Sequence, residues 1–224
     1  FRYFVKSLDF HRALYSMSLE KDYFDKIYAK TELIDGDYNA KSHARYLFQI
    51  LSLVEANVSS IADYGFGKGK LLYELLKLFR PAKVMALDSS EYAYNQLSKQ
   101  KWVKDWNIDL SHKDLSQIVP PKKAFDLGVC NSVLQYVQDE DLETIFERLS
   151  YSCRFVYLHV PSREDYQKLK LQSDFKDPWA KKRPDRVYQD LVAKYFTRVS
   201  WGLLESKTLV DEELSPFFDS LYRS

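Results

Sequence analysis

Three glycines spaced two apart follow an acidic residue in IADYGFGKGKLLYELL, the segment of residues 61–76. Before them lies VSSIA, a short β-rich apolar run, and after them KLLYELLKLF repeats leucine and phenylalanine at helical spacing. Gly65, Gly67 and Gly69 are therefore predicted to lie on a strand-to-helix turn. Glycines there let the backbone approach a ligand closely, and the following helix offers unpaired N–H groups.

The spacing of these glycines distinguishes between the nucleotide-binding turns. A dinucleotide fingerprint requires GxGxxG, whereas this turn reads GxGxG and continues with Lys70. A P-loop requires GxxxxGK followed by serine or threonine, whereas Leu71 follows here and no glycine lies five residues before Gly69. Asp63, two residues before the first glycine, would repel a pyrophosphate and attract an ammonium group. These features favour an adenosine-containing ligand other than a dinucleotide.

The composition is that of an ordinary globular chain. Of its 224 residues, 46% are hydrophobic and 16% aromatic, which is enough for a substantial core in one domain plus an appendage. The formal charge of +1 gives no global attraction to nucleic acid or anionic membranes, and no apolar run reaches the roughly 18 residues of a membrane span. Cys130 and Cys153 are the only cysteines, which excludes a disulfide framework and favours a cytoplasmic setting.

Apolar runs typical of strands alternate with segments of helical periodicity. Strands are predicted at residues 60–62, 84–88, 108–112, 125–130 and 154–160. Helices are predicted at residues 70–79, 91–99, 141–149 and 186–195. This alternation predicts an α/β fold with a parallel sheet and helices on both of its faces.

The two ends of the chain break this alternation. Residues 1–57 carry tyrosine, phenylalanine and leucine at helical spacing in two or three segments, with turn residues at Asp35, Gly36 and Asp37. We interpret them as a helical cap within the same domain. Near the other end, TRVSWGLLES and SPFFDSLYR are β-rich runs that could pair antiparallel at one sheet edge.

The glycine segment, Asp63-Tyr-Gly65-Phe-Gly67-Lys-Gly69, resembles motif I of the class I S-adenosylmethionine-dependent methyltransferases. In that family the acid-x-Gly-x-Gly-x-Gly turn holds the amino acid end of the cofactor. The resemblance implies a Rossmann-like, seven-stranded, mostly parallel sheet with an antiparallel terminal strand, spanning residues 58–224. It also implies methyl transfer from S-adenosylmethionine, with S-adenosylhomocysteine (SAH) as the product.

Two further acids match cofactor-binding positions of this family. Asp88, followed by Ser89, ends the second predicted strand, where a carboxylate can accept hydrogen bonds from both ribose hydroxyls. Asp88 could equally cap the next helix, and the two roles can coexist. Asp114, followed by Leu115, comes after the third strand, where the family often reads the adenine amino group; Asp109 is a competing candidate.

The segment FDLGVCNSVLQYV matches the family's fourth strand, whose end contacts the methionine portion and faces the methyl acceptor. The residues placed there are Asn131, Ser132, Leu134, Gln135 and Tyr136. The sequence NSVL departs from the Pro-Pro-aromatic motif with which many amino-group methyltransferases of nucleic acid and glutamine hold a planar nitrogen. An exocyclic amine is therefore disfavoured as the acceptor.

Histidines are the first candidates for a base, because a sulfonium methyl already is an activated electrophile and an acceptor mainly needs positioning and deprotonation. His159, near the end of the fifth strand, is the first candidate; it could instead be a buried structural imidazole. His43, on a predicted helix, could reach the site from the cap or could face solvent. His112 lies near the presumed adenine side, and His11 is too early in the chain to place.

The segment before the first long helix resembles the entry segment of many small-molecule methyltransferases, including antibiotic amino-sugar N-methyltransferases. In those enzymes a tyrosine-containing turn closes over the cofactor. Tyr28 and Tyr38 match these tyrosine positions approximately. Either phenol could contact the methionine carboxylate or line the acceptor pocket, or both could be core residues.

Residues 162–186 form a long connection after the fifth strand, which is typical of a lid or a binding loop. Its aromatic and basic residues would suit an acidic acceptor, although a solvated charged loop is the alternative. These residues are Trp179, Lys181, Lys182, Arg183 and Arg186.

The leading functional hypothesis is methyl transfer to oxygen or nitrogen of a small molecule, such as a sugar, a nucleotide-linked metabolite or a natural-product intermediate. The alternatives are a protein or RNA methyltransferase and a non-catalytic, cofactor-binding scaffold. The sequence lacks a basic stripe with interleaved aromatic residues, which is the pattern that indicates a nucleic-acid substrate. No metal is expected, because the acids at 139–141 are explained by the dipole of a helix that begins there.

Overall fold

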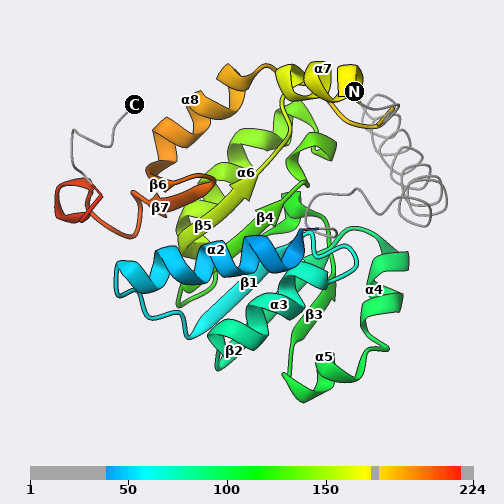
Figure 1. Ribbon diagram of the computed structural model, residues 1–224, viewed down its shortest axis with the longest axis vertical. Helices are drawn as coiled ribbons and strands as arrows, with labels where there is room; N and C mark the ends of the chain where they lie inside the picture. Colours follow the sequence, from blue (N-terminus) through cyan, green and yellow to red (C-terminus); the bar gives the residue numbers. More distant parts are fainter. Residues whose placement is uncertain (1–38, 173–176, 218–224) are drawn as a thin grey trace, which may run out of the picture.

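The computed structural model describes residues 39–172 and 177–217 of the chain. In these residues a seven-stranded sheet has the order β3-β2-β1-β4-β5-β7-β6 (Figure 1). The strands are β1 Ser60–Tyr64, β2 Lys83–Asp88, β3 Asp109–His112, β4 Phe125–Asn131, β5 Cys153–His159, β6 Phe196–Ser200 and β7 Leu203–Ser206. The pairs among β1 to β5 are parallel, whereas β7 pairs antiparallel with β5 and β6. The predicted α/β fold is confirmed.

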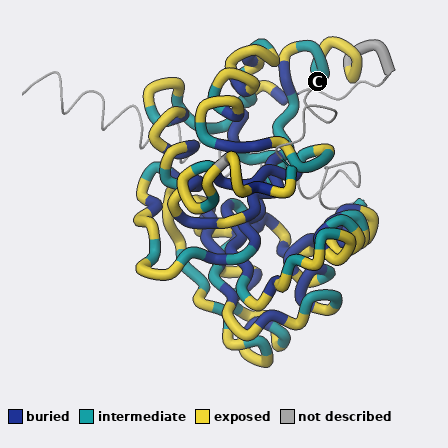
Figure 2. The backbone as a smooth tube through the Cα atoms, turned by 90° about the vertical axis from the view of Figure 1, so that its left-hand side faces the viewer, coloured by how far each residue is buried: buried dark blue, intermediate teal, exposed yellow. Residues whose placement is uncertain are grey.

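Helices pack against both faces of the sheet and bury two apolar layers (Figures 1 and 2). One layer contains Ile61, Leu127 and Phe155 with side chains from α2 Ala40–Leu53, α3 Lys70–Phe79, α4 Glu91–Leu97 and α5 Lys101–Asp105. The other contains Ala62, Tyr64 and Val156 with side chains from α6 Asp139–Ser152 and α8 Asp185–Tyr195. Strands buried on both faces explain why the parallel strands read as continuous apolar runs.

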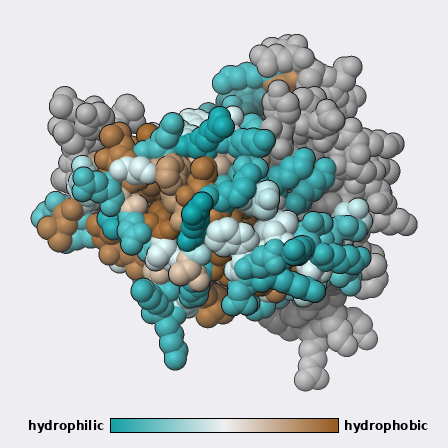
Figure 3. All heavy atoms as spheres, turned by 60° about the horizontal axis from the view of Figure 1, so that its bottom comes forward, coloured by the Kyte–Doolittle hydropathy of each residue, from teal (hydrophilic) through white to brown (hydrophobic). Residues whose placement is uncertain are grey.

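Short 3₁₀ turns and one further helix complete the described chain. The 3₁₀ turns are η2 Leu115–Gln117, η3 Leu134–Tyr136 and η4 Glu212–Leu214. Helix α7, Arg163–Gln172, lies inside the connection 162–186, so that segment is not an irregular loop throughout. Within the described chain no helix is long and apolar enough to cross a membrane. Seen from the bottom of Figure 1, the surface is largely hydrophilic, with hydrophobic side chains gathered in its left and central part (Figure 3).

The carboxylate of Asp126 fixes the register of β1 against β4 at the amino ends of these strands. It accepts hydrogen bonds from the backbone N–H and the hydroxyl of both Ser59 and Ser60, at 2.8 to 2.9 Å. Burial alone would raise the pKa of Asp126, but these hydrogen bonds to its charged form outweigh burial and lower it. The strand ends on the opposite edge are thereby set in register.

The terminal hairpin differs from the prediction. TRVSWGLLES folds back on itself, with β6 and β7 joined at Trp201 and Gly202. Gly202 has φ +66, which supplies the tight turn inside the first run. Residues 215–217 are not in a strand, and residues 218–224 lie outside the described residues.

The predicted N-terminal cap is described only in part. Helix α2 covers the sheet face that also carries α3, as Figure 1 shows. Its buried side chains recur at helical spacing, which is why this segment forms a helix that packs on the sheet: Ala40, His43, Ala44, Leu47 and Leu51. The other predicted cap segments, with His11, Tyr28, Tyr38 and the turn at 35–37, lie outside the described residues.

Candidate active site

Four polar side chains lie on one face of the sheet at the edge where the parallel strands end. Asp63 is in register with Val129 of β4, and Asn131, two residues further on, is in register with His159. On the other side of β1, Asp63 is in register with Ala86 of β2, and Asp88 follows Ala86 by two positions. Paired residues of parallel strands share a face, and side chains alternate along each strand. Asp63, Asp88, Asn131 and His159 therefore all face the layer formed by α2 and α3.

The glycine turn packs tightly against its surroundings. Gly65 has φ +100, and a Cβ there would lie 2.3 Å from Cγ2 of Val133, in the connection after β4. Gly69 has φ +70, and a Cβ there would lie 2.5 Å from Cδ1 of Leu97 in α4. Glycine is required at both positions by backbone conformation and by space. The strand-to-helix turn predicted from the sequence is confirmed.

Asp88 connects the glycine turn to the start of α4. One carboxylate oxygen accepts from the Gly67 N–H at 2.8 Å and the other accepts from the Ser90 N–H at 2.8 Å. The side chain that caps α4 is Ser90, which accepts from the Ala93 N–H at 3.1 Å. Asp88 thus supports the capping residue and also presents a buried carboxylate beside the glycine turn. The ribose role predicted for Asp88 and its neighbour Ser89 stays a prediction.

Asp63 is a buried carboxyl group with only 3% of its surface exposed. Burial, with a smaller contribution from the charge of Asp88, raises the pKa of Asp63 from 3.8 to about 8. A cation beside this carboxyl group would stabilise its charged form and lower that pKa again. The site is therefore suited to a ligand ammonium, as the sequence predicts.

The adenine side is less clearly defined. Asp114 caps η2, where it accepts from the N–H and hydroxyl of Ser116 at 2.8 and 2.6 Å, and Leu115 is buried behind it. Asp109 is exposed on β3. His112 contacts the Ser89 carbonyl through Nε2 at 2.9 Å, which ties β3 to the end of β2. The adenine-reading role of Asp114 and Leu115 stays a prediction.

Two amide side chains after β4 keep buried acceptor oxygens. Gln135 donates through Nε2 to the Ser132 carbonyl at 3.0 Å, while the Ser132 N–H donates to the His159 carbonyl at 2.7 Å. The Oδ1 of Asn131 and the Oε1 of Gln135 are buried and find no hydrogen-bond donor among the described residues. Buried acceptors are ordinarily satisfied, so both atoms are available to a ligand donor.

His43 and His159 lie beside each other, although 116 residues separate them in sequence. Their ring centroids are 6.4 Å apart in an edge-on arrangement. His43 is buried, and its Nδ1 is hydrogen-bonded to the hydroxyl of Tyr157. The solvent-facing alternative for His43 is therefore wrong. The sequence reasoning missed Tyr157, which could have been found because it lies two residues before His159 and so shares its face.

The connection between α7 and α8 is bound to the segment that follows β4. The Tyr136 hydroxyl donates to Oδ2 of Asp177 at 2.7 Å. The other oxygen of Asp177 accepts from the N–H groups of Trp179 and Ala180, both at 3.2 Å. Tyr136 and Trp179 are thus brought together by a buried aspartate that the sequence reasoning missed. Whether either residue contacts substrate stays a prediction.

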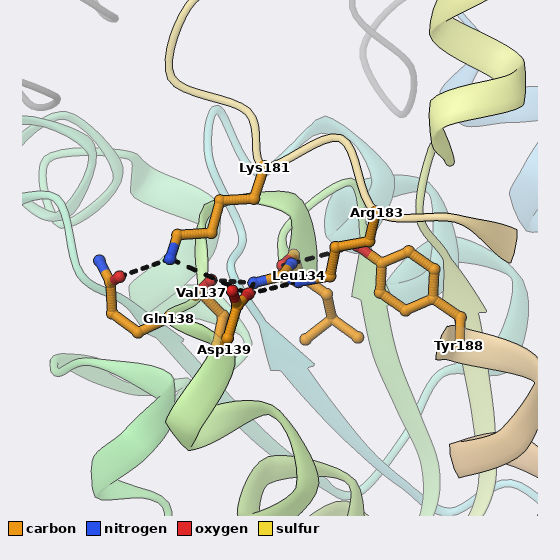
Figure 4. Close-up of polar contacts among 7 residues, drawn as sticks. All are labelled: Leu134, Val137, Gln138, Asp139, Lys181, Arg183 and Tyr188. Atoms are coloured by element: carbon orange, nitrogen blue, oxygen red, sulfur yellow. Dashed lines mark hydrogen bonds and ion pairs between the residues drawn. The ribbon is translucent and has the colours of Figure 1, made fainter. Parts of the chain in front are cut away.

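Arg183 is the centre of this attachment (Figure 4). Its guanidinium donates to the carbonyls of Leu134 and Val137 at 2.9 and 2.5 Å and pairs with Asp139 at 2.6 Å. Lys181 donates to Oε1 of Gln138 at 2.6 Å in the same cluster. Both basic side chains are therefore engaged with the protein itself, and the expectation that they serve an acidic acceptor loses its main support.

The other two basic residues named from the sequence, Lys182 and Arg186, have separate partners. Lys182 lies over the Tyr166 ring at 5.3 Å, and Arg186 pairs with Asp190 at 3.5 Å on the exposed face of α8. Asp139, at the start of α6, forms an ion pair with Arg183. Among the described residues no cluster of three or more histidines, cysteines or acids is arranged to hold a metal ion.

Replacing Arg183 tests its role in holding the two segments together. Arg183→Ala removes the guanidinium that donates to the Leu134 and Val137 carbonyls and pairs with Asp139, so we expect a loss of about 2 kcal/mol in the free energy of unfolding, measured with urea. Arg183→Lys should recover part of it. The matched control Arg186→Ala removes an exposed ion pair and should change stability by less than about 0.5 kcal/mol. Equal effects of the two alanine variants would contradict this account.

The raised pKa of Asp63 predicts a pH-dependent stability in the ligand-free protein. The folded state keeps a proton on Asp63 that the unfolded chain releases near pH 4. The contribution of this proton to the free energy of unfolding is therefore complete below about pH 4 and is lost as pH rises through about 8. The side chain introduced by Asp63→Asn is neutral at every pH. The melting temperature of this variant should therefore rise relative to that of the unmodified protein as the pH increases from 5 to 9. The exposed control Asp105→Asn should show no such trend. Parallel curves for Asp63→Asn would contradict the prediction.

Comparison with known proteins agrees with this geometry. Residues 61–154 match the sequence family described as a methyltransferase domain, and no curated protein matches the chain. The structure of the plantazolicin methyltransferase BpumL, in complex with a triazolic desmethylPZN analog and SAH, is similar with a TM-score of 0.65 and 16% identity. That match covers 87% of this chain and 77% of that one.

Magnesium protoporphyrin IX methyltransferase (ChlM) from Synechocystis PCC 6803, with bound SAH, is also similar. Its TM-score is 0.59 and its identity 16%, over 87% of this chain and 98% of that chain. At such identities the two structures establish the fold, while the family match covers the strands and turn that carry Asp63, Asp88 and Asn131. Together the family match and the shared fold support a class I S-adenosylmethionine-dependent methyltransferase, whose cofactor is S-adenosylmethionine.

Proposed function

We propose that this methyltransferase acts on an oxygen or nitrogen atom of a small molecule. The observation that carries the proposal is the placement of His43 and His159 beside Asn131, at the same sheet edge and on the same face as Asp63 and Asp88. Acid–base groups thus lie next to the cofactor-binding strands. A methyl acceptor bound between them would have its reacting atom within reach of an imidazole.

The residues present fit the cofactor. S-adenosylmethionine supplies an electrophilic methyl group on a sulfonium sulfur. The buried carboxyl group of Asp63 would take up the ammonium, and Asp88 would accept from the ribose hydroxyls beside the Gly67 N–H. The unsatisfied Oδ1 of Asn131 is a further acceptor for the amino acid end. Tyr38, predicted to close over this end, lies outside the described residues.

On the acceptor side, His159 is the residue best placed to act as a base. Its imidazole would take the proton from the acceptor O–H or N–H while the acceptor's lone pair forms the new bond to carbon. The methyl–sulfur bond would break as this bond forms, with SAH as the leaving group. His43, held by Tyr157, would either orient the acceptor or take the role of base itself. The hydroxyl of Tyr136 already donates to Asp177, which leaves it a weaker catalytic candidate than His159.

A small acceptor is favoured over a macromolecule by the surroundings of the site. The formal net charge is +1, and the basic side chains Lys181 and Arg183 are bound within the protein. A polyanionic acceptor would need free cations along its path. The two similar structures, by their names, are methyltransferases of plantazolicin and of magnesium protoporphyrin IX, and we take these acceptors as support for a small-molecule or natural-product acceptor.

A transfer assay with labelled cofactor tests this proposal. The protein would be incubated with methyl-tritiated S-adenosylmethionine and three separate pools: a panel of phenols, sugars and carboxylic acids, total RNA, and histones. We expect label only in the small-molecule pool. His159→Gln should lower kcat about 100-fold or more because a general base contributes at least that much.

The control is His112→Gln, which lies on the presumed adenine side and should alter KM for the cofactor rather than kcat. Label in RNA or histones would support the macromolecular alternative instead. A kcat unchanged by His159→Gln would remove that histidine from the mechanism.

A further inference from the structure

The turn between β6 and β7 holds Trp201 in a fixed position. Gly202 adopts φ +66, and a Cβ there would lie 2.9 Å from Cε2 of Tyr157, so only glycine fits. The Tyr46 hydroxyl donates to the Trp201 carbonyl at 2.7 Å, and the Leu158 N–H donates to the Gly202 carbonyl at 2.8 Å. The turn is thus fixed to α2 and to the end of β5.

This position puts the indole ring of Trp201 against the proposed acceptor side. Its centroid lies 5.2 Å from that of His159 and 5.8 Å from that of His43. Two tyrosine rings, Tyr46 and Tyr157, lie 5.8 and 6.2 Å away. The group of rings therefore joins the two histidines to the hairpin turn at the catalytic edge.

Trp201 is unusual in this group because 58% of its surface is exposed, whereas Tyr157 is completely buried and His43 is 5% exposed. A tryptophan that only completed the core would be covered. One part of the indole rests on buried rings, and the rest presents a rigid apolar surface to solvent next to His159. Ligand sites are lined mainly by hydrophobic and aromatic side chains with a few polar groups, and the indole beside His159 has this composition.

We propose that Trp201 is a specificity-determining residue that forms the outer wall of the acceptor site and stacks on a planar, conjugated ring of the acceptor. The inference rests on the proposed function and adds the chemical class of the substrate to it. A flat ring placed against the indole would bring a hydroxyl substituent toward His159. An aromatic ring gains a quadrupole interaction with the indole beyond the burial of its area, and a saturated ring of the same size does not.

Two matched probes test the proposal without knowledge of the natural acceptor. 2-Naphthol and decahydro-2-naphthol carry the same hydroxyl and the same number of carbon atoms, but only the first is planar. Their binding would be measured by saturation-transfer NMR on protein saturated with SAH. We expect 2-naphthol to bind at least about fivefold more tightly than its saturated counterpart. Trp201→Ala should abolish this preference and Trp201→Phe should keep most of it.

Tyr151→Ala, which removes an exposed aromatic side chain on α6, is the control and should leave the preference intact. Calorimetric titration of SAH into every variant distinguishes a failure of the proposed function from a failure of the role of Trp201. Absence of SAH binding to the unmodified protein would overturn the proposed function. SAH binding with an undiminished naphthol preference in Trp201→Ala, or with equal binding of both probes to the unmodified protein, would overturn the role of Trp201 alone.

Discussion

The parallel register of β2, β1, β4 and β5 is the constraint on which the site depends. Because these strands run in the same direction and their residues pair in register, side chains far apart in sequence end on one edge and one face. Asp126 holds that register from the opposite end by bonding to Ser59 and Ser60. A shift by one residue would turn Asp63 or Asn131 into the apolar layer under α6 and α8.

The loops around this edge are hydrogen-bonded to one another or packed against one another. The glycine turn is bonded to Asp88 and packs on Val133, and Arg183 holds the segment after β4 to the one that precedes α8. Tyr46 fastens the hairpin turn to α2. A site whose supports are hydrogen-bonded in this way is pre-organised, so binding of a ligand costs less ordering of the loops.

Sequence reasoning identified the sheet, the strand-to-helix turn and α3 because their signals are local: periodicity, glycine spacing and flanking apolar runs. The strand and helix ends deviated by at most three residues, with α6 running from 139 to 152 rather than from 141 to 149. The hairpin inside TRVSWGLLES was not predicted, since the glycine at 202 was read as part of one continuous strand. Helices α5 and α7 were not predicted, because α5 is only five residues long and α7 is rich in polar residues.

For the site, the sequence alone indicated which residue types lie at strand ends but not which meet across the fold. The pair of His43 and Tyr157 depends on how α2 crosses β5, and no local pattern encodes that. Lys181 and Arg183 were read as free cations because their partners, Gln138 and the carbonyls of Leu134 and Val137, are tertiary neighbours. Charge in a connection therefore says little about ligands until its partners are known.

We propose that the acids at the ends of β1 and β2 bind S-adenosylmethionine. The decisive measurement is isothermal titration of SAH into the unmodified protein and into Asp88→Ala, with NAD as the negative control. We expect micromolar binding of SAH, no binding of NAD and a loss of affinity of about 100-fold or more in the variant, since it lacks the carboxylate that would accept two charge-assisted hydrogen bonds from the ribose. Absence of SAH binding to a folded protein, or equal affinity in Asp88→Ala, would contradict it.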